Sequence, residues 1–509
     1  MKQRVWLLEL LQRRILIGIL LLIQLAFIVY SILSNSVSSD IIRECLTAVS
    51  FFVSLAVLSS RGKGAYKTSL VFLILMFPLF GGIFYLFYKW QLVFRPLSKR
   101  LDSTIKQTQK FAALPACQTS HAISQAPEHA NQIRYLEKCA QFPAYKDTKT
   151  VYFPVGEDMF SALIEEISRA ERYIFLEYFI IHVGDMWNTL YKLLEEKAEA
   201  GVDVRIICDD LGSFLGLPLE LTKKGKTKIK RVLFNRFVPF LSSVQNNRDH
   251  RKIAVIDGTT AFTGGINIAD EYVNLIDRFG HWKDTAVMLK GPGAWSFTVM
   301  FLQMWSLCTK KKETPTDYYP KSMPVYAEGG IMQPYADTPT DDENVCEHVY
   351  MQMISSAKDY LYITTPYLII DDSMLSALTL AAKSGVDVRI ITPNKYDKFW
   401  VHFTTRSYYK RLLHSGVKIY EYTPGFMHSK TVVCDGRAAT VGTTNFDFRS
   451  FYFHFECGVW MYDCAAVASV EKDFLCTLKK CKQINESDCK KNIFVRALQA
   501  ILRVFAPLM

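Results

Sequence analysis

Residues 250–257 read His-Arg-Lys-Ile-Ala-Val-Ile-Asp, and residues 428–435 read His-Ser-Lys-Thr-Val-Val-Cys-Asp, so both follow the pattern H-x-K-x4-D. A second shared element follows each copy, Gly265-Ile-Asn267 in the first and Gly442-Thr-Thr-Asn445 in the second, with a one-residue offset. The chain has only ten His, so two chance copies are not expected at average composition. A third His-x-Lys, at His281 and Lys283, lacks the Asp and is interpreted as an accident.

The spacing of each motif indicates one shared pocket. Residues i and i+2 lie on the same face of a strand, so we expect His250 beside Lys252 and His428 beside Lys430. The residues after each Lys are apolar or β-branched and lead into Asp-Gly, which predicts a buried strand ending in a tight turn. A strand with a hydrogen-bonded His and a solvated Lys would explain one copy, but not two copies with matched Asn residues.

The sequence around the motifs is also duplicated. Gly201-Val-Asp-Val-Arg-Ile-Ile207 recurs letter for letter at residues 385–391. Aromatic, apolar segments at 173–181 and 360–370 precede the two copies, with helix-like spacing of apolar residues in between. The order strand, helix, strand, motif strand predicts an α/β fold of two similar halves, packed about a pseudo-two-fold axis so that both His reach one site.

Composition divides the chain into six predicted segments. They are a membrane region (1–100), a connecting segment (101–150), the first half (151–308), a polar linker (309–322), the second half (323–485) and a C-terminal amphipathic helix (486–509). The last segment fits either an interfacial helix on a membrane or a terminal helix packed on the domain.

Three apolar stretches, Ile15–Leu33, Leu46–Leu58 and Ser69–Tyr88, predict two or three transmembrane helices. No small-residue cleavage site follows the first stretch, so we expect it to be retained. Basic residues flank these stretches and the net charge is +11, which favours anionic lipid but equally fits nucleic acid. If the N-terminus and the basic loop 61–67 are both cytoplasmic, the first two segments form a hairpin.

The motif residues suit displacement at phosphorus. One His attacks and forms a phosphohistidine, and the other protonates the leaving oxygen. Two ammonium groups, Lys252 and Lys430, hold the non-bridging oxygens with Asn267 and Asn445. We therefore expect no metal and no cofactor, and the twelve Cys show no metal-ligand spacing.

The last residue of each motif is expected to have a different task. Asp257 and Asp435 belong to the catalytic motif but stand at strand ends, five residues past each Lys. We expect them to fix local turns rather than touch the substrate.

From Tyr152 to Asp463 the chain resembles the phospholipase D superfamily, whose signature is this duplicated motif. Within it, several stretches are similar to bacterial cardiolipin synthases, and the match extends to Phe77–Tyr88 and Pro507-Leu508. These stretches are residues 247–258, 264–272, 280–284, 365–367, 425–430 and 445–450.

The resemblance implies a multi-pass enzyme of the bacterial plasma membrane that transfers a phosphatidyl group between two phosphatidylglycerol molecules, giving cardiolipin and glycerol. It implies His250 as the nucleophile and His428 as acid and base, although the symmetry allows the opposite roles. It also implies that an acidic residue from each half orients the His of the other. Asp284 and Glu456 fit that position, or are plain surface or strand-end charges.

Three alternatives remain open. A hydrolase would release phosphatidic acid from the same covalent intermediate, and a nuclease would act on nucleic acid. The membrane segments disfavour the nuclease, since a soluble polymer needs no bilayer anchor. The intact motifs disfavour a non-catalytic scaffold. The expected partners are phosphatidylglycerol and the membrane, not nucleic acid, and no feature indicates an oligomeric state.

Overall fold

The computed structural model describes residues 37–60, 63–77, 94–114, 119–222, 227–236 and 246–508, with single residues between 22 and 33. The chain forms two compact units. One comprises Met1–Pro96, Phe237–Asn247 and Ala500–Met509, and the other comprises Leu97–Arg236 and Arg248–Gln499. Each unit is described by itself.

The first unit contains α2 (Val37–Leu58) and α3 (Gly64–Met76), whose shared core is Val57, Leu70 and Ile74. Among the described residues, Asp40–Leu58 is the one helix long and apolar enough to cross a membrane. Its 19 residues include the predicted stretch Leu46–Leu58. At 13 residues, α3 is too short to cross a bilayer.

The other predicted membrane stretches are only partly covered by these helices. Most of Ile15–Leu33, and Ser69–Tyr88 beyond residue 77, lie outside the described residues. The structure therefore provides one candidate span and not the predicted two or three.

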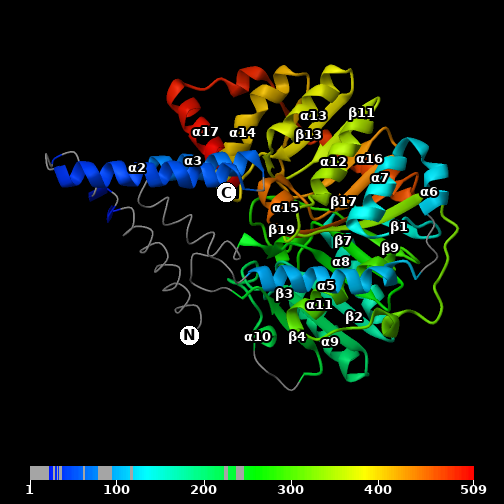
Figure 1. The fold of residues 1–509 in the computed structure, drawn as a ribbon. Helices are drawn as coiled ribbons and strands as arrows, with labels where there is room; N and C mark the ends of the chain where they lie inside the picture. Colours follow the sequence, from blue (N-terminus) through cyan, green and yellow to red (C-terminus); the bar gives the residue numbers. More distant parts are fainter. Residues whose placement is uncertain are drawn as a thin grey trace. The chain divides into compact units, whose positions relative to one another are not determined.

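The second unit contains two large mixed sheets (Figure 1). The first has the order β1-β9-β7-β6-β2-β3-β4. Its strands are β1 (Lys149–Phe153), β2 (Tyr173–Tyr178), β3 (Asp203–Asp209), β4 (Lys230–Phe234), β6 (Lys252–Ile256), β7 (Thr260–Gly264) and β9 (Ala286–Lys290).

The second sheet has the order β10-β19-β17-β16-β11-β13-β14-β20. Its strands are β10 (Ile331–Asp337), β11 (Tyr360–Thr364), β13 (Asp387–Pro393), β14 (Lys418–Tyr422), β16 (Thr431–Cys434), β17 (Ala438–Gly442), β19 (His454–Tyr462) and β20 (Cys481–Ile484). Apart from β20, this order repeats that of the first sheet strand for strand, which confirms the predicted α/β duplication.

Helices connect and cover the strands. They are α8 (Gly156–Ser168), α9 (Asp185–Glu199), α10 (Leu219–Thr222), α11 (Ala294–Thr309), α12 (Val345–Ser356), α13 (Asp372–Lys383), α14 (Phe399–His414), α15 (Phe448–Tyr452) and α16 (Ala465–Leu478). The helices α5 (Phe94–Ala112), α6 (Thr119–Gln125) and α7 (Ala130–Tyr135) precede the first sheet, and α17 (Ile493–Phe505) follows the second.

The repeated heptapeptide forms the centre of each sheet. It supplies β3 and β13, which pair in parallel with β2 and β11. The motif strands β6 and β16 run antiparallel to β2 and β11. Alternate residues of β2 face opposite sides: Ile174 and Leu176 pack with α8 and α9, and Phe175 packs with α11 in a core shared with the second half.

Two short strand pairs join the halves. β5 (Arg248–Asp249) pairs in parallel with the start of β19, and β15 (Gly425–Met427) pairs in parallel with β8 (His281–Lys283). The first crossing connects the first half to the second sheet, and the other connects the second half to a strand of the first. This reciprocal pairing is the local form of the predicted pseudo-two-fold arrangement.

Asp257 and Asp435 lie at the far end of the motif strands from the histidines. Both have left-handed backbone, with φ of 53° and 52°. The carboxylate of Asp257 accepts hydrogen bonds from the backbone N–H groups of residues 171, 172 and 173, at 2.8 Å each. Asp435 accepts the equivalent bonds from residues 358, 359 and 360. The structure thus places both carboxylates in turns that fasten the motif strand to its neighbour.

We expect Asp257→Ala and Asp435→Ala each to lower the free energy of unfolding by about 1–3 kcal/mol, because three backbone donors lose their acceptor. Thermal unfolding of the purified protein measures the loss, and Asp→Asn should recover part of it. Unchanged melting temperature with lost activity would instead place these carboxylates in the chemistry.

Candidate functional site

The two strand pairs that join the halves, β5 with β19 and β15 with β8, place each motif histidine beside a carboxylate of the other half. The backbone N–H of His250 donates to the carbonyl oxygen of Phe455 (3.0 Å), the residue before Glu456. The N–H of His428 donates to the carbonyl oxygen of Lys283 (2.8 Å), the residue before Asp284. The two halves therefore use the same backbone contact in both directions.

The side chains complete two histidine–carboxylate pairs. Nδ1 of His250 lies 2.9 and 3.0 Å from the two carboxylate oxygens of Glu456. Nδ1 of His428 lies 2.5 Å from Oδ2 of Asp284. Both carboxylates are fully buried and both histidines are 7% exposed. A proton on Nδ1 that is shared with the carboxylate leaves the Nε2 lone pair of each ring available for chemistry.

Burial keeps the imidazoles neutral. Desolvation, followed by the charge of Lys252, holds the pKa of His250 well below its usual value. Desolvation and the charge of Lys430 lower the pKa of His428 to about 4. A neutral imidazole is the form that can attack phosphorus.

Each lysine lies against the backbone of the histidine in its own motif. The ammonium of Lys252 donates to the carbonyl oxygen of His250 (2.5 Å), and that of Lys430 donates to the carbonyl oxygen of His428 and lies 2.9 Å from its Nδ1. Burial lowers the pKa of Lys252 to about 8 and that of Lys430 to about 7. Because burial disfavours the charged form of both lysines, a bound anion would stabilise their ammonium groups.

The two histidine–lysine pairs act on each other electrostatically. The charge of Lys430 helps to lower the pKa of His250, and the charge of Lys252 helps to lower the pKa of His428. The halves also meet beside these groups, where the hydroxyl oxygens of Thr285 and Ser429 lie 2.8 Å apart. Both pairs are therefore buried along the junction of the halves, and their joint action on one substrate is a prediction.

The sheet register removes the apparent offset between the Gly-x-Asn elements. The N–H of Gly265 donates to the carbonyl oxygen of Thr285, and the N–H of Thr443 donates to that of Cys457, both at 2.9 Å. Gly265 thus corresponds to Thr443, and Asn267 to Asn445, with no offset. A Cβ at Gly265 would collide with Asp284, whereas the hydroxyl of Thr443 donates to Glu456.

The two asparagines differ in what they bind. Oδ1 of Asn267 accepts from the N–H of Ile180 (3.0 Å), and its Nδ2 donates to the hydroxyl of Tyr272 (2.7 Å). Nδ2 of Asn445 donates to Asp447 (3.2 Å), while its buried Oδ1 has no hydrogen-bond partner among the described residues. In this structure Asn267 positions protein groups, and a role on substrate phosphate remains a prediction for both.

Aromatic side chains around the histidines were not anticipated from the sequence. The ring of Phe179 lies 5.1 Å from that of His250, and Tyr272 and Trp282 lie 5.5 and 5.2 Å from His428. These rings limit the contact of both imidazoles with water. In the sequence, Tyr272 and Trp282 lie in the stretches 264–272 and 280–284, and Phe179 lies in the aromatic segment 173–181.

His454 is a further group that the sequence did not single out. Its ring lies 5.3 Å from that of His250, and its Nδ1 lies 3.6 Å from Glu456. Within the described chain, His250, His454 and Glu456 place three potential metal-ligand atoms within 4.8 Å of one another. The position of His454 two residues before Glu456, on the same strand face, would have indicated it.

The third His-x-Lys lies on β8, where it builds the second crossing between the halves. The ammonium of Lys283 pairs with Asp473 at 2.8 Å, away from the histidines. His281 and Lys283 therefore do not form a third histidine–lysine pair of the motif type. The strand that carries them instead helps to place Asp284.

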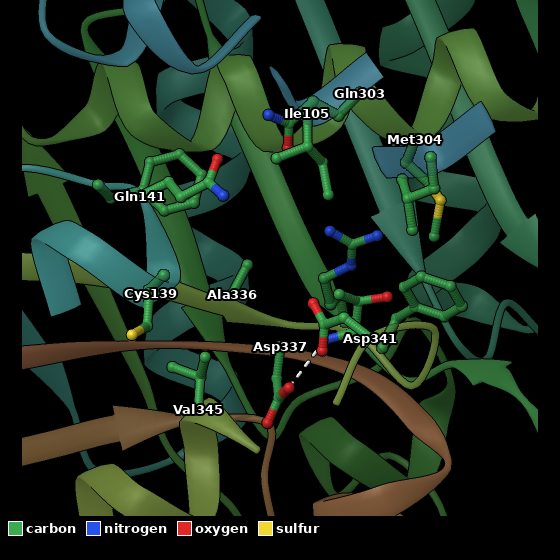
Figure 2. A pocket seen from close by; sticks show the side chains of 15 residues that line it. Ile105, Cys139, Gln141, Gln303, Met304, Ala336, Asp337, Asp341 and Val345 are labelled. Atoms are coloured by element: carbon green, nitrogen blue, oxygen red, sulfur yellow. Dashed lines mark hydrogen bonds between the residues drawn. The ribbon is translucent and has the colours of Figure 1, made fainter. Parts of the chain in front are cut away.

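Figure 2 shows a separate pocket of about 60 Å³, whose lining includes Ile105, Gln303 and Asp341. Arg251 also lines it, and alternation along the strand places this side chain on the opposite face from His250 and Lys252. Arg251 pairs with Glu177 at 2.9 Å. None of the four motif His and Lys residues lines this pocket, so it is not the catalytic site.

The duplicated sheet order and the reciprocal histidine–carboxylate pairs define an α/β protein of the phospholipase D type. The family described as "Cardiolipin synthase, PLD-like domain" matches residues 163–305 and 350–477. The chain belongs to this family.

Individual relatives agree with this assignment. An uncharacterized protein of Streptococcus mutans serotype c is 41% identical over 86% of this chain and 95% of its own length. A cardiolipin synthase of Geobacillus sp. (strain WCH70) is 34% identical over 90% of this chain and 92% of its own length. The crystal structure of phosphatidylserine synthase from Haemophilus influenzae Rd KW20 has a TM-score of 0.54 at 15% identity, over 71% of this chain and 93% of that one. It supports the fold.

Lowering the pH from 7 to 5 should destabilise the protein through His428. The unfolded chain takes up a proton near pH 6.5, whereas the folded state resists it down to about 4, so stability falls across this window. We expect a smaller drop in melting temperature for His428→Gln, which is neutral at every pH and keeps an N–H donor for Asp284. An equal drop in both proteins would contradict the lowered pKa.

Proposed function

We propose that the two-histidine site transfers a phosphatidyl group from one phosphatidylglycerol to another, so that the chain acts as a cardiolipin synthase. The proposal is supported by one observation: His250 and His428 are each held by a carboxylate of the other half, and each is buried beside the lysine of its own motif. The relatives named cardiolipin synthase support the choice of lipid chemistry.

The first step forms a phosphohistidine. Nε2 of His250 attacks the phosphorus while its Nδ1–H stays bound to Glu456, which stabilises the cationic ring. The bond from phosphorus to the oxygen of the head-group glycerol breaks, and that oxygen takes a proton from Nε2 of His428. Glycerol then leaves. His428 takes up this Nε2 proton from water when the substrate binds, because the anionic phosphodiester raises its pKa, while its Nδ1 proton stays bound to Asp284.

The second step reverses the proton transfer. The hydroxyl of a second phosphatidylglycerol gives its proton to Nε2 of His428, and its oxygen attacks phosphorus. The bond from phosphorus to His250 breaks and cardiolipin is released. The ammonium groups of Lys252 and Lys430 hold the non-bridging oxygens throughout, so no step requires a metal or a cofactor.

The burial of the site favours an alcohol over water as acceptor. Both histidines are 7% exposed and aromatic rings surround them, which limits hydrolysis of the phosphohistidine. A lipid hydroxyl that fills the site therefore reacts before water does.

Purified enzyme in phosphatidylglycerol vesicles should form cardiolipin and free glycerol without added metal or nucleotide. We expect His250→Ala and His428→Ala each to lower the rate about a thousandfold or more, because each removes a partner of the same two steps. Thin-layer or mass-spectrometric analysis of the lipids measures both products.

Three results would contradict the proposal. Phosphatidic acid as the main product would identify a hydrolase, and near-normal activity of either variant would exclude the two-histidine mechanism. Labelled phosphatidylglycerol tests the order of roles. Peptide mapping of the acid-labile labelled intermediate, trapped from the unmodified enzyme, should place the label on His250, and a label on His428 would exchange the two roles.

The N-terminal region is proposed to cross the plasma membrane more than once. The apolar stretches 15–33, 46–58 and 69–88 and the single candidate helix support this. Reporter enzymes that work only outside the cytoplasm, fused after residues 36 and 62, should give opposite signals. Equal signals at both positions would show that the second stretch does not cross.

A further inference from the structure

Exposed apolar side chains of the second unit concentrate on three loops and on the first residues of the helices that follow two of them. The loops follow β3, the 3-10 turn Asp270–Val273, and β13, and the helices are α10 and α14. Together with Val183 beside the first loop, nine large apolar side chains, between 36% and 68% exposed, form what we name the apolar rim. They are Val183, Leu211, Leu215, Leu219, Leu275, Ile276, Tyr396, Phe399 and Trp400.

The rest of this unit, as far as it is described, shows a different distribution. Leu114, Val325, Leu380 and Leu475 are exposed singly on separate elements. Scattered apolar residues are normal on a protein surface, whereas a clustered set indicates a partner. The one other cluster, Ile493, Phe494 and Leu498, lies on α17. There the Gln499 side chain donates to the carbonyl oxygen of Phe403 on α14 at 3.5 Å.

The first loop is fixed directly over the His250 side of the site. Gly212 approaches Phe179 so closely that a Cβ there would lie 2.7 Å from its ring, and Phe179 contacts His250. The N–H of Val183 donates to the carbonyl oxygen of Gly216 at 2.8 Å. Leu211 and Leu215 are therefore carried by a loop whose inner side is part of the wall around the histidine.

The other two loops adjoin the His428 side. Tyr272, just before Leu275 and Ile276, is 5.5 Å from the ring of His428. Asp397, in the third loop, accepts from the buried hydroxyl of Tyr367 at 2.5 Å, and the ammonium of Lys398 lies 5.2 Å from the centre of the Tyr367 ring. A Cβ at Gly280 would lie 2.8 Å from the ammonium of Lys395, so these two loops touch.

Aromatic and long cationic side chains stand together on the rim. Lys395 and Lys398 flank Tyr396 and Asp397 just before Phe399 and Trp400, and Arg278 follows Leu275, Ile276 and Asp277. Lys398 pairs with Asp397 at 3.3 Å and Arg278 pairs with Glu271 at 2.8 Å, so these charges are largely balanced. Exposed aromatic rings beside long cationic side chains are typical of protein segments that lie at the head-group level of a bilayer.

We propose that the apolar rim rests in the head-group region of a lipid bilayer and admits lipid substrates from that surface to the two histidines. The inference rests on the proposed function for the nature of the substrate. The bilayer, rather than a second protein, is favoured because the rim surrounds a site whose substrate is itself a component of the bilayer.

Two substrates separate docking from chemistry. The full-length enzyme in lipid nanodiscs acts either on dioleoyl phosphatidylglycerol diluted in phosphatidylcholine or on water-soluble dibutanoyl phosphatidylglycerol. We expect Phe399→Ala/Trp400→Ala to lower the ratio of the bilayer rate to the soluble rate at least about tenfold, because two large apolar anchors are lost. The control Leu380→Ala, 67% exposed outside the rim, should leave the ratio unchanged. An unchanged ratio in the rim variant would overturn the proposal.

A second measurement is independent of turnover. Leu215 and Leu380 have nearly equal exposure, 68% and 67%, so hydroxyl radicals should oxidise them equally if both face water. In nanodiscs containing phosphatidylglycerol we expect Leu215 to be protected several-fold relative to Leu380. Equal oxidation would refute the docking surface, whatever the activity. Protection without any cardiolipin formation would instead refute the proposed function alone.

Discussion

The structure depends on two short backbone pairings that cross between the halves. β5 aligns His250 with Glu456 through the carbonyl oxygen of Phe455, and β15 aligns His428 with Asp284 through that of Lys283. Each pairing involves only two or three residues, yet its register determines which carboxylate each imidazole contacts. Two similar sheets without these crossings would present two incomplete sites, each with a histidine and a lysine but no partner carboxylate.

The crossings also explain how so many charges tolerate burial. Two lysines, two histidines and two carboxylates lie in one region that is at most 7% exposed. The lowered pKa values of Lys252 and Lys430 show that burial is only partly offset by Glu456 and Asp284. The two carboxylates match the two ammonium groups in number, and a bound anionic phosphodiester favours the charged forms of the lysines that burial opposes.

The sequence alone was sufficient to predict the strands and motifs that the two halves share. The heptapeptide 201–207 and its copy predicted β3 and β13, and the His-x-Lys spacing predicted the composition of the site. It was insufficient for features that depend on register. The Gly-x-Asn elements matched by letters suggested an offset, because Gly265 was paired with Gly442, whereas backbone hydrogen bonds pair it with Thr443. Strands as short as β5 and β8 carry too few residues for a periodic signal, so the crossings were also beyond prediction.

The two halves differ on the face of each motif strand that points away from its histidine. The difference lies in which side chains pair there with the neighbouring strand. Arg251, between His250 and Lys252, pairs with Glu177 on β2. At the equivalent place Ser429 accepts a hydrogen bond at 3.0 Å from Thr364 on β11, the strand that corresponds to β2. An ion pair in one half thus replaces a hydroxyl pair in the other. Neither pair faces the substrate, so the halves can diverge there while the reciprocal backbone contacts keep both imidazoles in the same relation to their carboxylates. The symmetry of the chemistry is therefore maintained by the crossings and not by identical surroundings.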